Sequence, residues 1–295
     1  MPLNLSVATE DLGSSLKRAI GIAASMEVPG VRLNTRHELD VLNASESALR
    51  QTLHYVKERQ MRVAGLRCPT RHSLYDPEFL EPRLDVVQRS MSLCRKLETE
   101  ELIVRCGRIP DPDDSTAPQS ADDDIHSQAN PFSFESLGKT QGPTQTEEFS
   151  QLRQILNDLT SHANHVGCIL NLQLADFNLP LIRRLLSEIH SGPIRVTFDS
   201  ATAIMTGANV TLTYRDLYQH VGYVRARDAQ KDVDGAGIET ATGVGSVDWV
   251  EFIATLEEAG YQGWTCVERS GGENRTDDVR RGVEYLKRLI SQEAQ

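Results

Sequence analysis

The chain has 295 residues, of which 39% are hydrophobic and 25% charged, a composition ordinary for a soluble globular protein. It contains no apolar run of roughly eighteen residues and no basic-then-apolar leader, so we expect a cytoplasmic protein that makes no contact with a membrane. The formal net charge of −11 argues against nucleic acid as a partner, because an acidic chain does not attract a phosphate backbone.

Short apolar or β-branched runs alternate with helical stretches along the first third of the chain. The runs predict strands, and the helices are indicated by apolar residues such as Leu49, Leu53 and Val56 that recur on one helix face. The predicted strands cover residues 3–8, 30–33, 62–68 and 101–106, and the predicted helices cover 14–26, 45–60 and 81–97.

The segment 108–146 then interrupts this alternation. It is rich in Pro, Asp, Ser, Gln and Gly, a composition that favours disorder or a mobile lid, and both alternatives stay open. We interpret its acidic run, Asp122–Asp124, as solvated loop rather than as a cation site. The segment is therefore treated as a flexible insertion within a single domain that spans residues 1–295.

The alternation resumes after the insertion. Predicted strands cover residues 168–174, 194–199, 221–228 and 264–268, and predicted helices cover 147–164, 179–189, 249–259 and 277–291. Eight strands with crossover helices in a chain of this size predict an α/β fold, a (β/α)₈ TIM barrel with a long loop after the fourth strand. The main alternative is an open doubly wound sheet. The chain has no GxGxxG turn at the start of its first helix, which disfavours that fold.

The five cysteines are few, scattered and odd in number, and no two of them form a CxxC pair. This distribution indicates reduced, mostly buried thiols rather than a disulfide framework or a zinc site.

In a TIM barrel the active site lies at the carboxyl ends of the strands. Side-chain alternation predicts that Cys266 and Trp264 point inward if Glu268 does, and that Tyr223 points inward if Arg225 does. The polar residues that close the predicted third to eighth strands are Arg67, Arg105, Gln173, Asp199, Arg225, Arg227 and Glu268.

Four motifs in the carboxyl-terminal part carry a resemblance to a known family. In chain order they are FDSATAIMTG, YVRARDA, TGVGSVDW and LEEAGYQGWTCVE. Over residues 167–286 their order and spacing resemble the xylose-isomerase-like sugar phosphate isomerase/epimerase superfamily. The amino-terminal half fits that family only through its order of strands and helices.

The resemblance implies one divalent metal, Mn, Mg or Zn, held by Glu, Asp, His and Glu on the last four strands. The corresponding residues here are Gln173, Asp199, Arg225 and Glu268, and the family's nearby second His corresponds to Thr202. An amide is a weaker ligand than a carboxylate, and a guanidinium is a permanent cation without a lone pair to donate. We therefore expect a degenerate site in which metal is absent or weakly bound, through Asp199 and Glu268 with Gln173 as a weak third ligand.

The expected replacement for the metal is Arg225, its guanidinium reaching Asp199, Glu268 or both. An offset of about two positions in the YVRARDA motif would instead place Arg227 or Asp228 in the site.

Two readings of loop residues also stay open. His37 and His72 follow the second and third strands, where a His either contacts substrate or is simply solvated. Gly243 and Gly245 either bring backbone N–H groups to a phosphate or lead into a helix capped by Asp248.

The resemblance implies an isomerase of the aldose–ketose type or an epimerase, acting on a small carbohydrate, a sugar acid or a sugar phosphate. The expected catalytic residues are Glu268, as the base, and Asp199. The expected substrate-binding residues are Arg225, Arg105, Arg67, Gln173 and His72. For Arg67 and Arg105, salt bridges along the rim of the barrel stay open as the alternative.

The alternative function is a catalytically silent barrel that binds a sugar-like ligand or a protein partner. An abasic-site nuclease on the same barrel is disfavoured by the acidic charge and by the lack of a His-rich set of metal ligands. Whether the chain forms a homo-oligomer stays open.

Overall fold

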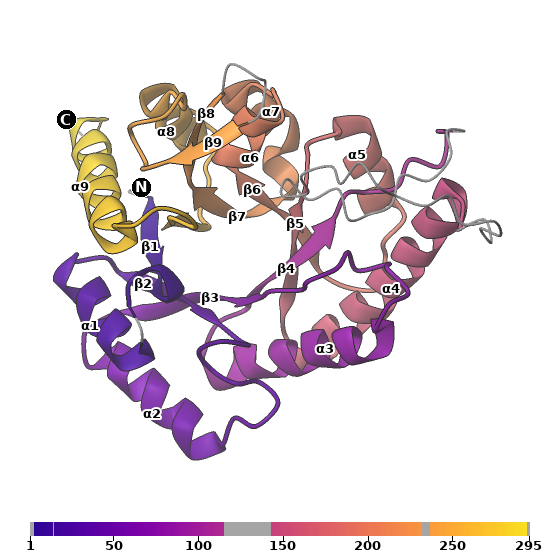
Figure 1. The fold of residues 1–295 in the computed structure, drawn as a ribbon, viewed down its shortest axis with the longest axis horizontal. Coiled ribbons are helices and arrows are strands. Elements are labelled where there is room, and N and C mark those ends of the chain that lie inside the picture. The colour runs from indigo at the N-terminus through magenta and orange to yellow at the C-terminus, as the bar shows by residue number, and fades with distance from the viewer. Residues whose placement is uncertain (1–2, 14, 115–142, 232–236, 294–295) are drawn as a thin grey trace, which may run out of the picture.

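The computed structural model describes residues 3–13, 15–114, 143–231 and 237–293. Eight parallel strands form a closed barrel in the order β1-β10-β7-β6-β5-β4-β3-β2, so the first strand pairs with the last and leaves no edge. The predicted (β/α)₈ TIM barrel is confirmed (Figure 1). The barrel strands are β1 (Asn4–Ala8), β2 (Gly30–Asn34), β3 (Arg62–Cys68), β4 (Glu101–Gly107), β5 (Ile169–Leu174), β6 (Ile194–Asp199), β7 (Val221–Ala226) and β10 (Trp264–Val267).

Helices surround the barrel, and local sequence fixes their ends. Thr144 and Glu147 form a capping box that starts the longest helix, α4, and Gly167 ends it in the left-handed conformation at φ 73°. The α-helices are α1 (Leu16–Ser25), α2 (Glu46–Lys57), α3 (Leu80–Lys96), α4 (Gln145–Val166), α5 (Leu179–Ser187), α6 (Ser200–Met205), α7 (Val210–Leu217), α8 (Trp249–Glu258) and α9 (Arg275–Glu293); the 3₁₀ turns are η1 (Thr9–Asp11) and η2 (Tyr218–His220).

The barrel has two apolar cores of unequal size. The larger one fills the layer between strands and helices, and the smaller one lies inside the barrel, where Tyr223 and Cys266 pack with Ala8 and Ile103 and against Trp264. The expected alternation therefore holds for β7 and β10.

Two stretches differ from the sequence-based prediction. Residues 221–228 were expected to form one strand, but β7 ends at Ala226, and β8 (Asp228–Lys231) pairs antiparallel with β9 (Gly237–Thr240) in a separate two-stranded sheet. Between β6 and β7 lie two helices, α6 and α7, that were not predicted from the sequence. Asp199 and Asn209 start them by accepting hydrogen bonds from Thr202 N and Leu212 N.

The insertion 108–146 is described only at its two ends. Arg108 forms an ion pair with Asp176 at 3.2 Å, and Asp111 N donates to Gln145 Oε1 at 2.9 Å. The acidic run Asp122–Asp124 lies outside the described residues.

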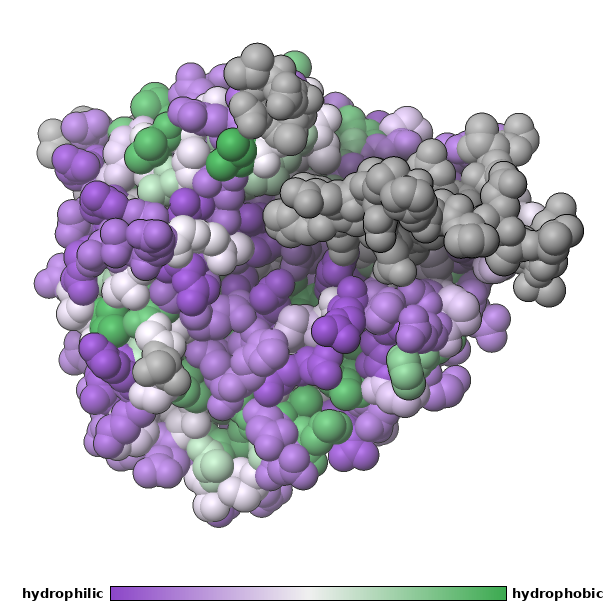
Figure 2. All heavy atoms as spheres, in the orientation of Figure 1, coloured by the Kyte–Doolittle hydropathy of each residue, from purple (hydrophilic) through white to green (hydrophobic). Residues whose placement is uncertain are grey.

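All five cysteines are free and buried, as expected. No helix in the described part of the chain is long and apolar enough to cross a bilayer. Figure 2 shows mostly hydrophilic residues on the face that it presents, with the hydrophobic ones in smaller groups between them.

Candidate active site at the barrel mouth

Arg225 lies between two carboxylates at the carboxyl end of the strands. Its Nη1 donates to Asp199 Oδ2 at 2.7 Å, and its Nε and Nη2 donate to Glu268 Oε2 at 2.9 and 2.7 Å. Asp199 faces Arg225 directly in the register of β6 with β7, and Glu268 follows the last residue of β10, the other neighbour of β7. All three side chains are at most 3% exposed. The guanidinium therefore joins both retained carboxylates.

A second arginine, Arg32, contacts Glu268 from β2, which β1 separates from β10 in the barrel. Arg32, in the middle of β2, donates to Glu268 Oε1 through Nη1 and to Glu10 Oε1 through Nη2 at 2.7 Å. Glu10 also accepts from Arg67 Nη1 at 3.1 Å and from the amide of Asn34. Both oxygens of Glu268 are thus engaged by arginine.

The pairing continues on the far side of Asp199. Arg227 donates to Asp199 Oδ2 through Nη1 at 2.8 Å and to Glu239 Oε1 through Nε at 3.0 Å. Asp228, by contrast, points away from the mouth. The ion pairs form one alternating chain, the mouth network, of Arg67, Glu10, Arg32, Glu268, Arg225, Asp199, Arg227, Glu239, Arg269, Asp278 and Arg281.

The arginines decide the protonation of the central acids. Burial alone would raise the pKa of Glu268, but Arg225 and Arg32 outweigh it and hold that pKa at about 2. Asp199 is likewise buried, and Arg227 and Arg225 hold its pKa below the ordinary value. Both acids therefore stay ionised near neutral pH and bind a proton weakly.

The residues at the mouth do not fit the divalent metal that the family implies. Arg225 places a permanent positive charge between Asp199 and Glu268 and uses the oxygens that would coordinate an ion. At an effective dielectric constant of about 20, two like charges about 4 Å apart repel by roughly 4 kcal/mol per unit charge. Among the described residues, no group of three or more His, Cys, Asp or Glu is placed to hold a metal ion.

The other expected substrate-binding residues differ in whether they point into the barrel. Arg67 and Gln173 each present a buried atom without a hydrogen-bond partner, Nε and Oε1 respectively. Arg105 lies opposite Gln173 in the register of β4 with β5, and its Nη1 donates to the backbone oxygen of Arg71. His72 is paired with Asp76 at 3.0 Å. Arg67, Arg105 and Gln173 point into the barrel, whereas His72 is tied to its own loop.

Several acids and amides of the mouth were not predicted from the sequence, above all Glu38. Its Oε2 accepts from Asn34 N at 2.6 Å and from Thr9 Oγ1 at 2.7 Å, beside Glu10. Burial raises the pKa of Glu38 to about 7 despite these hydrogen bonds. The signal that could have found this region is polar residues directly after the first two strands, in ATED and LNTRHE.

Asp228 explains the TGVGSVDW motif. Its Oδ1 accepts from Ala229 N and Val247 N at 2.9 and 3.1 Å, and its Oδ2 accepts from Gly243 N and Trp249 Nε1 at 3.0 and 2.9 Å. Two of the loop's N–H groups are thus used inside the protein, and Asp248 caps α8 by accepting from Glu251 N at 3.0 Å. The helix-start interpretation agrees with this geometry better than a phosphate cradle does.

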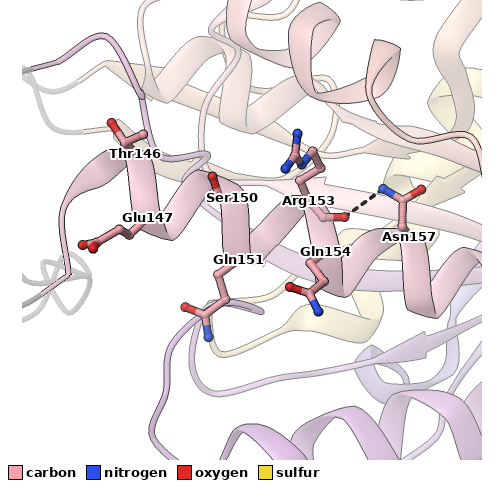
Figure 3. A pocket seen from close by; sticks show the side chains of 7 residues that line it. All are labelled: Thr146, Glu147, Ser150, Gln151, Arg153, Gln154 and Asn157. Carbon is pink, nitrogen blue, oxygen red and sulfur yellow. Dashed lines mark hydrogen bonds between the residues drawn. The ribbon is translucent and has the colours of Figure 1, made fainter.

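A separate trough of about 680 Å³ runs along α4. Its lining residues all come from that helix, and in Figure 3 Gln151, Gln154 and Asn157 lie on successive turns. Asn157 Nδ2 donates to Arg153 O at 3.1 Å, so the polar groups are partly engaged within the helix. The trough lies outside the barrel mouth, and we assign it no function.

The family of the chain follows from its match to a protein-family model. The family model described as xylose isomerase-like TIM barrel matches residues 20–289. The chain belongs to this family. No curated protein sequence matches the chain.

Solved structures with the same xylose isomerase-like fold include sugar epimerases. A xylose isomerase domain protein from Planctomyces limnophilus is 17% identical, with a TM-score of 0.77 and coverage of 100% of this chain and 99% of that one. The 3-keto-D-glucoside 4-epimerase from E. coli is 13% identical, with a TM-score of 0.72 and coverage of 97% and 99%. D-psicose 3-epimerase with D-tagatose, from Clostridium cellulolyticum H10, is 9% identical, with a TM-score of 0.72 and coverage of 98% and 99%. At these identities the likeness shows the fold alone.

Proposed function

We propose that this chain binds a small carbohydrate, or a sugar acid or sugar phosphate, at the mouth of its barrel without a divalent metal. The observation that carries the proposal is Arg225, which supplies a fixed positive charge between Asp199 and Glu268. Arg67 Nε and Gln173 Oε1, both buried and unpartnered, offer a donor and an acceptor to ligand hydroxyl groups. The proposed compartment is the cytoplasm, in line with five free cysteines.

Ligand binding is tested by thermal unfolding of the full chain with D-tagatose, D-fructose or gluconate at millimolar concentration. A ligand that binds only the folded state raises the midpoint, and we expect the same rise with EDTA as with added Mn²⁺. Gln173→Met should abolish the rise, whereas Gln151→Met, in the trough on α4, should leave it intact. If no ligand shifts the midpoint, or if the shift requires Mn²⁺, the proposal is wrong.

Isomerisation or epimerisation is the second candidate function. In either reaction a base removes a proton from the carbon beside the carbonyl, and the proton returns to the neighbouring carbon or to the other face. Glu268 and Asp199 are the carboxylates expected for this work. Glu268, with a pKa of about 2, accepts a proton poorly, and the arginines lower the pKa of Asp199 as well. The observation that favours a reaction is Glu38, a mouth carboxyl with a pKa of about 7.

Proton transfer is tested by incubating the full chain with each sugar in D₂O and following deuterium at the carbon next to the carbonyl. Exchange would support the reaction, and its absence with retained binding would support the silent barrel. If exchange occurs, Glu268→Gln and Glu38→Gln identify the base, since only the variant that lacks it binds sugar without exchange.

A further inference from the structure

The carboxylate of Glu239 lies in a ring of donors outside the centre of the mouth. Ser270 N donates to its Oε1 and Gly271 N to its Oε2, both at 2.9 Å, and Arg227 Nε donates to Oε1 at 3.0 Å. The Glu239 side chain is only 12% exposed. Two successive backbone N–H groups beside a guanidinium are a common way to bind a free carboxylate or phosphate.

One donor in this ring makes no hydrogen bond to Glu239, although the two side chains form an ion pair. Arg269 Nη1 is buried without a hydrogen-bond partner and lies 3.5 Å from Glu239 Oε2. The guanidinium cannot turn freely to find another acceptor, because its Nε donates to Asp278 at 3.1 Å. An anion with a third oxygen, or a carboxylate placed slightly differently, would accept this hydrogen bond as well.

The position of the ring in the barrel also points to a ligand. Ser270 and Gly271 lie in the loop between β10 and α9, and loops after the last two strands often form the phosphate site of TIM barrels. Glu239 belongs to β9, in the preceding loop (Figure 1). Arg227 contacts both Glu239 and Asp199, so the ring is one guanidinium away from the centre of the mouth.

We propose that Arg227, Arg269 and the N–H groups of Ser270 and Gly271 form a binding site for a small oxyanion. The oxyanion is a carboxylate or a phosphate monoester, and Glu239 occupies the site until the ligand displaces its side chain. Glu239 keeps the two arginines paired when no ligand is bound, since an unpaired buried charge is unfavourable. This proposal rests on the proposed function in one respect only: the part of the ligand beyond its acid group would lie toward Arg225.

The test follows the amide resonances of Ser270 and Gly271 in the full chain during titration with inorganic phosphate or with acetate. We expect saturable shifts in the wild-type chain with at least one anion, and the better anion identifies the ligand's acid group. Glu239→Gln removes the competing charge and should tighten binding about ten-fold or more, since only a neutral amide then has to be displaced. Glu257→Gln, an exposed change of the same charge on α8, should leave the affinity unchanged.

Arg269→Met should weaken binding in the wild-type background and in the Glu239→Gln background alike. If neither anion shifts the two amides of the wild-type chain, Glu239 is a fixed structural partner and the proposal is overturned, even if the variant binds phosphate. Anion binding here without any effect of D-tagatose or gluconate on the unfolding midpoint would support this site and contradict the carbohydrate proposal.

Discussion

Arg225 holds one oxygen of Glu268 with two of its nitrogens, Nε and Nη2, at 2.9 and 2.7 Å. The other oxygen of Glu268 accepts from Arg32. A carboxylate bound on both sides in this way cannot turn toward an ion without breaking a buried pair. We therefore expect Glu268 to bind an ion poorly as long as both arginines are in place.

Removal of Arg225 should destabilise the fold strongly. Arg225→Met leaves Asp199 and Glu268 close together with fewer counter-charges, and breaking a buried pair from one side costs about 3–5 kcal/mol. The free energy of unfolding from urea titration measures this loss. Arg89→Met is the control, because the Arg89–Asp85 pair at 2.7 Å is about half exposed and should contribute less than about 1 kcal/mol. Equal losses in the two variants would show that the mouth network adds no special stability.

Glu38 should make stability fall as the pH rises toward neutrality. The pKa of Glu38 is about 7 in the folded chain, against an ordinary value of 4.5 for a Glu side chain, so between these values the folded state binds more protons than the unfolded state. Glu38→Gln cannot lose a proton, and it should gain roughly 1–3 kcal/mol over wild type between pH 4.5 and pH 8. Urea unfolding at both pH values measures the gain.

The control for Glu38 is Glu257→Gln, which removes the same charge at an exposed position on α8. The acids with lowered pKa, Glu10 and Glu268 at about 2, behave oppositely: their stabilisation is present above about pH 4.5 and is lost as the pH falls toward 2. Glu10 and Glu268 are present in both wild type and Glu38→Gln, so their titration does not mask the difference in stability between the two proteins. A constant difference between wild type and Glu38→Gln would contradict the assignment of Glu38 as the titrating group.

Sequence alone predicted the barrel and the centre of its mouth. The alternation of apolar runs and helices predicted the eight strands of the barrel, though not β8 and β9. Because the carboxyl ends of parallel strands meet at one end of a barrel, Asp199, Arg225 and Glu268 were expected to converge. The expected contact of Arg225 with Asp199 or Glu268 came from the family resemblance, and an offset that would place Arg227 or Asp228 there had been left open. How each side chain acts on a ligand stays a prediction.

The outer parts of the mouth network could not be predicted in the same way. Arg32 lies in the middle of a short apolar strand, and its partner Glu268 is 236 positions away across the barrel closure. Glu239 belongs to a polar stretch without strand-like alternation, which pairs only because β8 lies beside it. Such pairs depend on which strands become neighbours, and that information is not local.

Asp228 should be important for stability rather than for ligand binding. Asp228→Asn replaces one acceptor oxygen by a donor that faces other N–H groups, and unmade buried hydrogen bonds cost about 2–4 kcal/mol together. The fluorescence of Trp249, whose indole N–H donates to Asp228 Oδ2, should change as well. Asp248→Asn is the matched control, because Asn caps a helix as well as Asp does. A small loss in Asp228→Asn would show that the loop is held by other contacts.

Restoring the family's ligand types should restore metal binding. The double change Gln173→Glu and Arg225→His removes the central positive charge, frees Oε2 of Glu268 and adds a carboxylate beside Asp199. Removal of one like charge about 4 Å from an ion is alone worth roughly 4 kcal/mol per unit of ionic charge at a dielectric constant of about 20. We expect about one equivalent of Mn²⁺ by calorimetry in the double variant, with an affinity at least about 100-fold above that of wild type. Adding Asp199→Asn to the double variant should reduce the affinity for Mn²⁺ again. Stoichiometric Mn²⁺ binding by the wild-type chain would contradict this account, because it would mean that an ion can displace the Arg225 guanidinium from Asp199 and Glu268.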